Sequence, residues 1–186
     1  MLTPDQAIQK VLIDQDAIQQ RVAVLGEEIS RDYAGLDQPL VLICILKGSF
    51  VFCADLMRQL TIPHEVHFMS VSSYNGGTSS SGEVKIEQDL DISIADRDVL
   101  IIEDIIDTGL TLDYLTHMFA ERAPRSLALC TLLDKPEARQ REVEVRYIGF
   151  SIDLEFVVGY GLDYDQQFRG LPYIAVLRPE VYQDQD

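Results

Sequence analysis

Short, continuously apolar runs recur along the chain and are separated by segments with a different spacing. The run LVLICIL at 40–46 lies between Pro39 and Lys47-Gly48, and it contains no polar position at all. Such runs are typical of strands buried on both faces of a sheet. We expect strands at 40–46, 64–71, 98–102, 126–133, 147–152, 155–160 and 173–177.

The intervening segments have the spacing of amphipathic helices. Ile18, Val22, Leu25 and Ile29 follow one another at intervals of four, three and four, which places them on one helical face. This spacing predicts a helix between Asp14 and Tyr33, with the Asp14 side chain as its N-cap. We expect further helices at 51–60, before Pro63, and at 110–124, where Pro124 ends the pattern.

Regular alternation of strand and helix predicts an α/β fold. Strands joined by helices form parallel sheets with right-handed crossovers, so we expect a central, mostly parallel β-sheet flanked by helices. The chain of 186 residues contains no internal repeat and no linker-like composition shift. We therefore expect one domain spanning residues 1–186.

Charge and hydropathy exclude several classes of function. The net charge is -16, which repels phosphate backbones, so we expect no binding to nucleic acid. No apolar run approaches the roughly 20 residues that span a bilayer, and we expect no membrane partner. The N-terminal MLTPDQAIQK lacks the basic and apolar regions of a secretion signal, which favours a cytoplasmic location.

One long segment lacks both periodicity and apolar residues. Residues 72–83, SSYNGGTSSSGE, are dense in Ser and Gly and predict a mobile surface loop. An inert linker is one interpretation. Long loops within compact domains are often lids over binding sites, and we favour that interpretation.

The most informative stretch is VLIIEDIIDTGLT, at 99–111. It places Glu103, Asp104 and Asp107 near the carboxyl end of an apolar strand, where ligands bind in open α/β sheets. Gly109 permits a positive φ, and the amides that open the next helix can converge on one anion. The turn formed by residues 107–111 is thus a candidate phosphate site, although it matches neither GxxxxGK[ST] nor GxGxxG.

The acidic pair complements this anion site. The carboxylates of Glu103 and Asp104 can accept hydrogen bonds from a vicinal diol and can help hold Mg²⁺. A ribose 5-phosphate carries both a phosphate and a vicinal diol, so it fits a phosphate site that lies beside a diol and metal site. The alternative is a solvated acidic turn with Thr108 or Thr111 as an N-cap.

These residues closely resemble a known family motif. VLIIEDIIDTGLT is similar to the phosphoribosyl-diphosphate motif of type I phosphoribosyltransferases, and its EDIIDTG form resembles that of the hypoxanthine-guanine branch. Other segments resemble that family in the same order, so the likeness spans nearly the whole chain. They are ILKGSF at 45–50, VSSYNGGTSSSGEVKI at 71–86, TLLDKPEAR at 131–139 and FVVGYGLDYDQQFRGLPYIAVL at 156–177.

The resemblance implies how 5-phosphoribosyl 1-diphosphate is bound. Glu103 and Asp104 would bind the ribose hydroxyls, and Lys47 and Gly48 would present amides to the pyrophosphate next to a peptide bond that is often cis. Asp163 would help hold a second Mg²⁺ through water, and Mg²⁺ is the implied cofactor. The 5-phosphate would be held by Asp107, Thr108, Gly109, Leu110 and Thr111.

The resemblance also implies how a base is recognised. Lys135 would donate to O6 of a 6-oxopurine, Phe156 would stack on the ring, and the carbonyl of Val157 would accept from N1 or N2. A cationic donor at O6 rejects a 6-amino group, so hypoxanthine and guanine are expected in preference to adenine. Asp107 would accept the proton from N7 and act as the catalytic residue.

Three further residues complete the implied site. Arg169 would bind the pyrophosphate, and Ser73 and Tyr74 would belong to a lid that excludes water from the reacting centre. The resemblance further implies a small hood built from the chain termini and assembly into a homodimer or homotetramer.

We therefore expect a purine-salvage enzyme that forms IMP or GMP from a free base and phosphoribosyl diphosphate. One alternative is a regulatory protein that keeps this fold and binds nucleic acid, for which the chain lacks basic character. Another is an enzyme of the same type that prefers xanthine.

Overall fold

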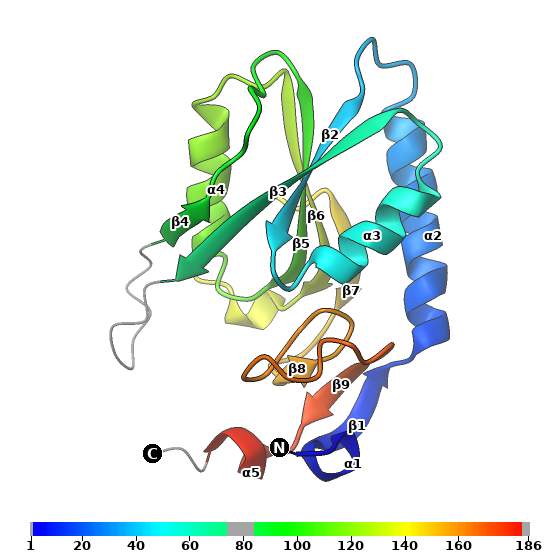
Figure 1. The fold of residues 1–186 in the computed structure, drawn as a ribbon, viewed down its shortest axis with the longest axis vertical. Helices are drawn as coiled ribbons and strands as arrows, with labels where there is room; N and C mark the ends of the chain where they lie inside the picture. The colour runs from blue at the N-terminus through cyan, green and yellow to red at the C-terminus, as the bar shows by residue number, and fades with distance from the viewer. Residues whose placement is uncertain (1, 74–83, 184–186) are drawn as a thin grey trace.

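A computed structural model describes residues 2–73 and 84–183 (Figure 1). Its main sheet has six strands, and all neighbouring pairs except β3 and β4 are parallel, which confirms the expected α/β fold. The strands lie in the order β4 (Val84–Gln88), β3 (His64–Ser73), β2 (Leu40–Leu46), β5 (Asp98–Ile106), β6 (Ser126–Asp134) and β7 (Tyr147–Ser151).

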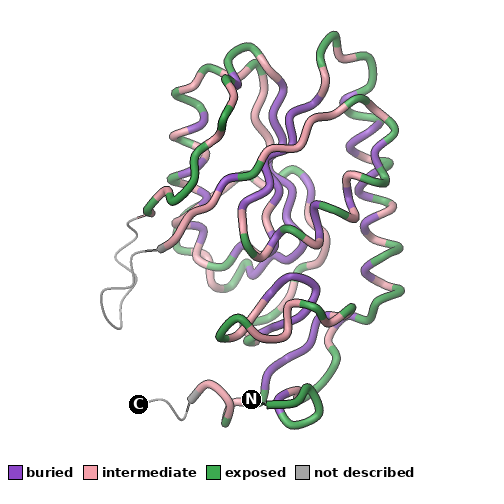
Figure 2. The backbone as a smooth tube through the Cα atoms, in the orientation of Figure 1, coloured by how far each residue is buried: buried purple, intermediate pink, exposed green. Residues whose placement is uncertain are grey.

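Helices cover both faces of this sheet. Helices α2 (Gln15–Asp32) and α3 (Phe50–Gln59) pack on one face and α4 (Leu110–Ala120) on the other (Figure 1). Strand β2 supplies alternate residues to the two apolar cores, so it is buried on both sides as its sequence predicted. The buried backbone is concentrated in these central strands (Figure 2).

The helical pattern in α2 was predicted correctly. The Asp14 carboxylate accepts a hydrogen bond from the Ala17 amide at 2.8 Å and caps the helix. Ile18, Val22, Leu25 and Ile29 are all buried against the sheet.

A second, antiparallel sheet joins the two ends of the chain. Its strands are β1 (Ile8–Ile13), β9 (Ile174–Leu177) and β8 (Val157–Val158), with β9 in the middle. The short helices α1 (Pro4–Ala7) and α5 (Pro179–Gln183) adjoin it, and the Arg178 amide donates to the Ala7 carbonyl at 2.9 Å. We call this sheet, with α1, α5 and the loop 159–173, the hood (Figure 1). Its presence confirms the expectation of a hood built from the termini.

Several boundaries differ from the sequence predictions. Strand β5 continues past residue 102 to Ile106, because it stays paired with β6 as far as Asp134. Helix α4 ends at Ala120, before Pro124, and the 155–160 run contributes only the two residues of β8. Strands β1 and β4 were not predicted, and Tyr74 and most of the 72–83 loop lie outside the described residues.

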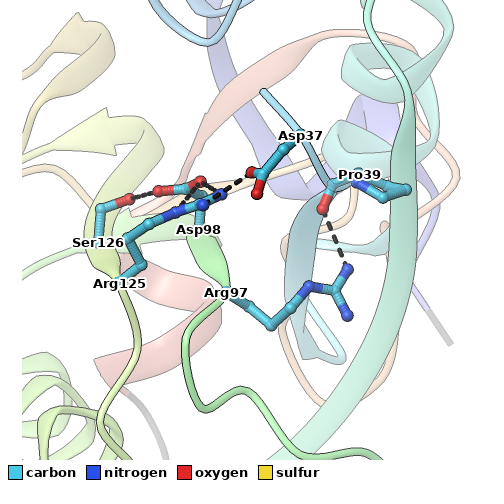
Figure 3. Close-up of polar contacts among 6 residues, drawn as sticks. All are labelled: Asp37, Pro39, Arg97, Asp98, Arg125 and Ser126. Carbon is cyan, nitrogen blue, oxygen red and sulfur yellow. Dashed lines mark hydrogen bonds and ion pairs between the residues drawn. The ribbon is translucent and has the colours of Figure 1, made fainter. Parts of the chain in front are cut away.

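A polar network closes the end of the sheet where β5 and β6 begin (Figure 3). Arg125 Nε donates to the Asp98 carboxylate at 2.8 Å, and its Nη1 donates to Asp37 at 2.7 Å. The Ser126 hydroxyl donates to Asp98 at 2.5 Å. Arg97 donates to the Pro39 carbonyl at 3.1 Å. This network lies at the end of the sheet where the parallel strands begin. It leaves the opposite end, formed by the carboxyl ends of those strands, for binding.

Among the described residues, no helix is long and apolar enough to cross a membrane.

Candidate active site

A cavity of about 300 Å³ opens at the carboxyl ends of β2 and β5. It brings together two segments of the sequence that the family motifs singled out, the 46–48 loop and the 103–111 stretch. The predicted site residues that line this cavity are Lys47, Gly48, Glu103, Asp104, Asp107, Thr108, Gly109 and Thr111. A larger cavity of about 490 Å³ lies beside α4 and β6, but no predicted site residue lines it.

The acidic pair forms one wall of the smaller cavity. Glu103 and Asp104 lie within β5 and not beyond its end, which corrects the expected position. The Asp104 carboxylate accepts a hydrogen bond from the Ile105 amide at 2.9 Å. Burial and the neighbouring Asp104 charge raise the pKa of Glu103 well above its ordinary value. Two carboxylates crowded in this way favour a ligand that brings positive charge or hydroxyl donors.

The 107–111 turn connects β5 to α4. Gly109 adopts a left-handed conformation with φ 81° and serves as the N-cap of α4, so the first amides of the helix have no carbonyl partner within the helix, beside a turn that lines the cavity. The Thr108 hydroxyl accepts from the Leu110 amide at 3.4 Å. This arrangement of helix amides and hydroxyls is suited to an anion. Leu110 itself begins α4 and does not line the cavity.

A neighbouring segment supports this turn and was not predicted to belong to the site. The amides of Gln140 and Arg141 both donate to the Thr108 carbonyl, at 2.8 and 3.1 Å. Arg139 Nη1 donates to the Asp107 carbonyl at 3.1 Å, and its Nη2 pairs with the Asp134 carboxylate. The only sequence signal was an Arg four residues after Lys135 in TLLDKPEAR, which does not reveal its partner.

The 46–48 loop lies directly beside the acidic pair in the wall of the cavity. The peptide bond between Leu46 and Lys47 is cis, as the family resemblance implied. A side chain on Gly48 would overlap the Asp104 carboxylate, so the two segments are in direct contact. The 46–48 backbone and the acidic oxygens thereby lie next to each other in the wall of one small cavity.

Lys135 and Asp107 lie together at the rim. Lys135 is 8% exposed, and its Nζ is 3.7 Å from the Asp107 Oδ2. Its amide donates to the Ile106 carbonyl at 2.9 Å, which holds the start of the 3₁₀ helix η1 (Pro136–Ala138) against the end of β5. A cationic donor and a carboxylate acceptor are therefore adjacent.

Phe156 and Val157 lie in the hood and do not line the 300 Å³ cavity. The Phe156 ring stacks on Tyr182 with centroids 4.9 Å apart and meets the Tyr164 ring edge-on at 5.7 Å. The Phe156 carbonyl accepts from the Leu177 amide of β9 at 2.9 Å. Since successive residues of a strand point their polar groups in opposite directions, the Val157 carbonyl faces away from β9. Among the described residues, no strand pairs with that edge of β8.

Asp163 and Arg169 contact each other in the hood loop. Arg169 Nη2 is 2.8 Å from the Asp163 carboxylate, and its Nη1 donates to the Gly161 carbonyl at 2.8 Å. Neither residue lines the cavity. Ser73 ends β3, and Tyr74 lies outside the described residues.

The donor set suits a metal that retains other ligands. Among the described residues, no group of three or more His, Cys, Asp or Glu side chains could enclose a metal ion. Glu103 and Asp104 supply two hard oxygen donors at one wall. Mg²⁺ is commonly held by one or two carboxylates, with water and substrate oxygens completing its shell, so these residues fit it.

Comparison with known proteins shows the family to which the chain belongs. The family described as "Phosphoribosyl transferase domain" matches residues 9–165. The hypoxanthine-guanine phosphoribosyltransferase of Mycobacterium tuberculosis is 52% identical over 180 residues, covering 95% of this chain and 89% of the relative. A crystal structure of a hypoxanthine phosphoribosyltransferase from Staphylococcus aureus has a TM-score of 0.90 and 48% identity, covering 94% of both chains.

A mutant hypoxanthine phosphoribosyltransferase from Trypanosoma cruzi, solved as a ternary substrates complex, has a TM-score of 0.88 and 45% identity. It covers 94% of this chain and 98% of its own.

The fold, the acidic pair and the helix-initiating turn together define the class of protein. The chain belongs to the phosphoribosyltransferase family. The relatives that share about half of its residues narrow the assignment. Within that family it belongs to the hypoxanthine-guanine phosphoribosyltransferases.

Proposed function

We propose that this chain transfers the 5-phosphoribosyl group from 5-phosphoribosyl 1-diphosphate to N9 of hypoxanthine or guanine. The products are IMP or GMP and pyrophosphate. The observation that carries the proposal is the cavity in which the acidic pair of β5, the 107–111 turn and the 46–48 loop meet. Each of these parts complements one part of the activated sugar.

The 5-phosphate binds at the 107–111 turn. Helix-start amides and the hydroxyls of Thr108 and Thr111 supply donors, and no lysine side chain is required. In a chain with net charge -16, a local cluster of backbone donors allows an anion to bind despite the overall repulsion.

The ribose hydroxyls bind Glu103 and Asp104, and the pyrophosphate binds the backbone of Lys47 and Gly48. Carboxylates accept two hydrogen bonds from a vicinal diol, which a deoxy sugar cannot provide. Glu103 and Asp104 would hold one Mg²⁺, and Asp163 would help hold a second through water; bound there, Mg²⁺ would supply positive charge to the pyrophosphate. Arg169 offers a further cation for that anion when its pairing with Asp163 is exchanged for the ligand.

The base is held between the hood and the rim of the cavity. Phe156 stacks on the purine, the Val157 carbonyl accepts from N1 or N2, and Lys135 donates to O6. Lys135 is almost fully buried, so a 6-amino group facing it would leave two hydrogen-bond donors, the amino group and the Lys135 ammonium group, without an acceptor. This disfavours adenine.

In the reaction, the bond from N9 to the ribose C1 forms as the bond from C1 to the pyrophosphate oxygen breaks. Positive charge develops on the ribose ring, and the nearby carboxylates stabilise it. Asp107 accepts the proton that leaves N7, with Lys135 beside it at 3.7 Å. Closure of Ser73 and Tyr74 over the site would exclude water and prevent hydrolysis of the sugar.

A spectrophotometric assay with hypoxanthine, guanine, xanthine and adenine, with and without Mg²⁺, tests this function. We expect Mg²⁺-dependent turnover of hypoxanthine and guanine. Preferential turnover of xanthine would show a different base specificity, and no turnover of any base would contradict the proposal. We also propose a homodimer or homotetramer, and sedimentation as a monomer at micromolar concentration would exclude it.

A further inference from the structure

The hood contacts the core at a partly buried hydrogen bond outside the cavity described above. The Tyr160 hydroxyl, in the hood loop, donates to the Asp55 carboxylate of α3 at 2.6 Å. Tyr160 is 6% exposed, and burial together with this hydrogen bond raises the pKa of its hydroxyl above the ordinary value. The hydroxyl therefore remains protonated and donates throughout the neutral pH range.

A backbone contact lies beside this hydrogen bond. Gly161 packs so closely on Gly48 that a side chain at position 161 would overlap the Gly48 carbonyl oxygen. The hood loop is itself firmly held at this point, since the Tyr160 amide donates to the Leu171 carbonyl at 2.8 Å and the Gly161 amide to the Arg169 carbonyl at 2.9 Å. The loop thus contacts the core at two adjacent points.

Both contacts connect parts of the chain that are assigned to different substrates. Asp55 lies in α3, which begins at Phe50, directly after the 46–48 loop assigned to the pyrophosphate. Tyr160 follows β8 and is four residues from Phe156, which is assigned to the base. Two cavities of about 230 and 210 Å³ flank the hydrogen bond, and Tyr160 and Asp55 line both of them.

We propose that the hydrogen bond from Tyr160 to Asp55 is a positioning contact that fixes the base-binding hood relative to the pyrophosphate-binding loop. This inference rests on the proposed function, because it assumes that the hood holds the base and the 46–48 loop holds the pyrophosphate. Neither residue lines the 300 Å³ cavity. Their role is to align the purine N9 with the ribose C1.

A contact that aligns two bound substrates affects turnover more than affinity. Displacement of reacting groups by about 1 Å can lower a rate by about 100-fold, whereas each substrate keeps its own binding contacts. We expect Tyr160→Phe to lower kcat by about tenfold. The KM values for hypoxanthine and phosphoribosyl diphosphate should stay within about twofold.

The chain offers a matched control. The Tyr147 hydroxyl donates to the Asp32 carboxylate at 3.0 Å, and Tyr147 is 3% exposed. Tyr147→Phe therefore deletes the same kind of partly buried hydrogen bond, between β7 and α2, away from both segments assigned to substrates. Both variants should lose a similar amount of thermal stability, and only Tyr160→Phe should lose turnover. Equal kcat values for the two variants, or a rise in KM without a fall in kcat, would overturn the inference.

Hydrogen exchange followed by mass spectrometry tests the contact without any assay of activity. In Tyr160→Phe, amide exchange should increase in peptides covering 44–50 and 159–171, whereas in Tyr147→Phe these peptides should exchange as in the wild type. Unchanged exchange at 44–50 in Tyr160→Phe would overturn the inference. If the wild-type protein turns over no base, the proposed function fails, and the exchange experiment still decides whether the hydrogen bond holds the two segments together.

Discussion

Arg139 provides the sharpest test of how the 107–111 turn is held in place. Its guanidinium bonds both the Asp134 carboxylate and the Asp107 carbonyl, and the two side chains of the ion pair are only 12% and 10% exposed. Arg139→Gln would leave Asp134 as a buried, unpaired charge. Loss of one partner of a buried pair costs about 3 kcal/mol. In a protein of this size, that corresponds to a fall in Tm of about 6 to 12 °C.

The same substitution removes one charge-assisted hydrogen bond to the turn. Such a bond contributes about 1.5 kcal/mol to the positioning of its acceptor, so the KM for phosphoribosyl diphosphate should rise about tenfold. The KM for hypoxanthine should change less, because Arg139 contacts no assigned base-binding side chain. Thermal unfolding and steady-state kinetics measure the two effects separately.

A double variant separates stability from positioning. Asp134→Asn combined with Arg139→Gln removes the unpaired charge and should regain most of the lost Tm, but it does not restore the bond to the Asp107 carbonyl. Arg31→Gln, at an arginine that is 73% exposed on α2, is the control for the change in charge. If the double variant recovers both Tm and the KM for phosphoribosyl diphosphate, Arg139 does not position the turn and the reasoning is refuted.

Three further predictions follow from the site and the fold. Lys135→Met should lower kcat/KM for hypoxanthine by about 100-fold and narrow the difference in kcat/KM between hypoxanthine and adenine, because the donor to O6 is lost. Unchanged selectivity between the two bases in a competition assay would argue against this role. Asp104→Asn should raise the Mg²⁺ concentration for half-maximal activity about tenfold, measured by titration into metal-free enzyme, and an unchanged requirement would place the metal elsewhere. Burial raises the pKa of Asp98, but hydrogen bonds from Arg125 and Ser126 outweigh it, so the pKa is lowered overall. Its contribution to stability is therefore present above the unfolded pKa of about 3.9 and is lost as pH falls through the folded value. Asp98→Asn should lower the free energy of unfolding at pH 7 and make this free energy decline less steeply as the pH falls. A difference in the free energy of unfolding between the two proteins that stays constant at all pH values, measured by denaturation, would contradict this.

The elements that the sequence predicted best are those with strong local patterns. The bounds of β2 match the predicted run because all seven residues are apolar and Pro39 and Lys47-Gly48 limit it. The α2 helix follows from its regular apolar spacing and the Asp14 cap. In both cases the information lies within the segment itself.

The elements that were missed depend on pairing with distant residues. Strand β1 exists because Ile8–Ile13 pairs with Ile174–Leu177 at the other end of the chain, and nothing within the segment IQKVLI reveals that partner. The last four residues of β5 were not expected to be strand because their acidic residues break the apolar run, but β6 continues to pair with them.

The same distinction holds within the site. The EDIIDTG motif located the acidic pair and the turn, since both lie in one continuous stretch. The contacts that support it were not predicted: Arg139 reaches back 32 residues to Asp107, and Tyr160 reaches 105 residues to Asp55. Family resemblance predicted which residues would bind the substrates, whereas the structure was needed to show how these residues are held in position.

The proposed binding of a ribose 5-phosphate by β5 and the turn after it is tested most directly by a crystal structure of this protein with IMP. We predict that the 5-phosphate contacts the amides of residues 108–111 and that the ribose hydroxyls contact Glu103 and Asp104. A phosphate bound outside the turn, with the ribose away from the acidic pair, would contradict the account.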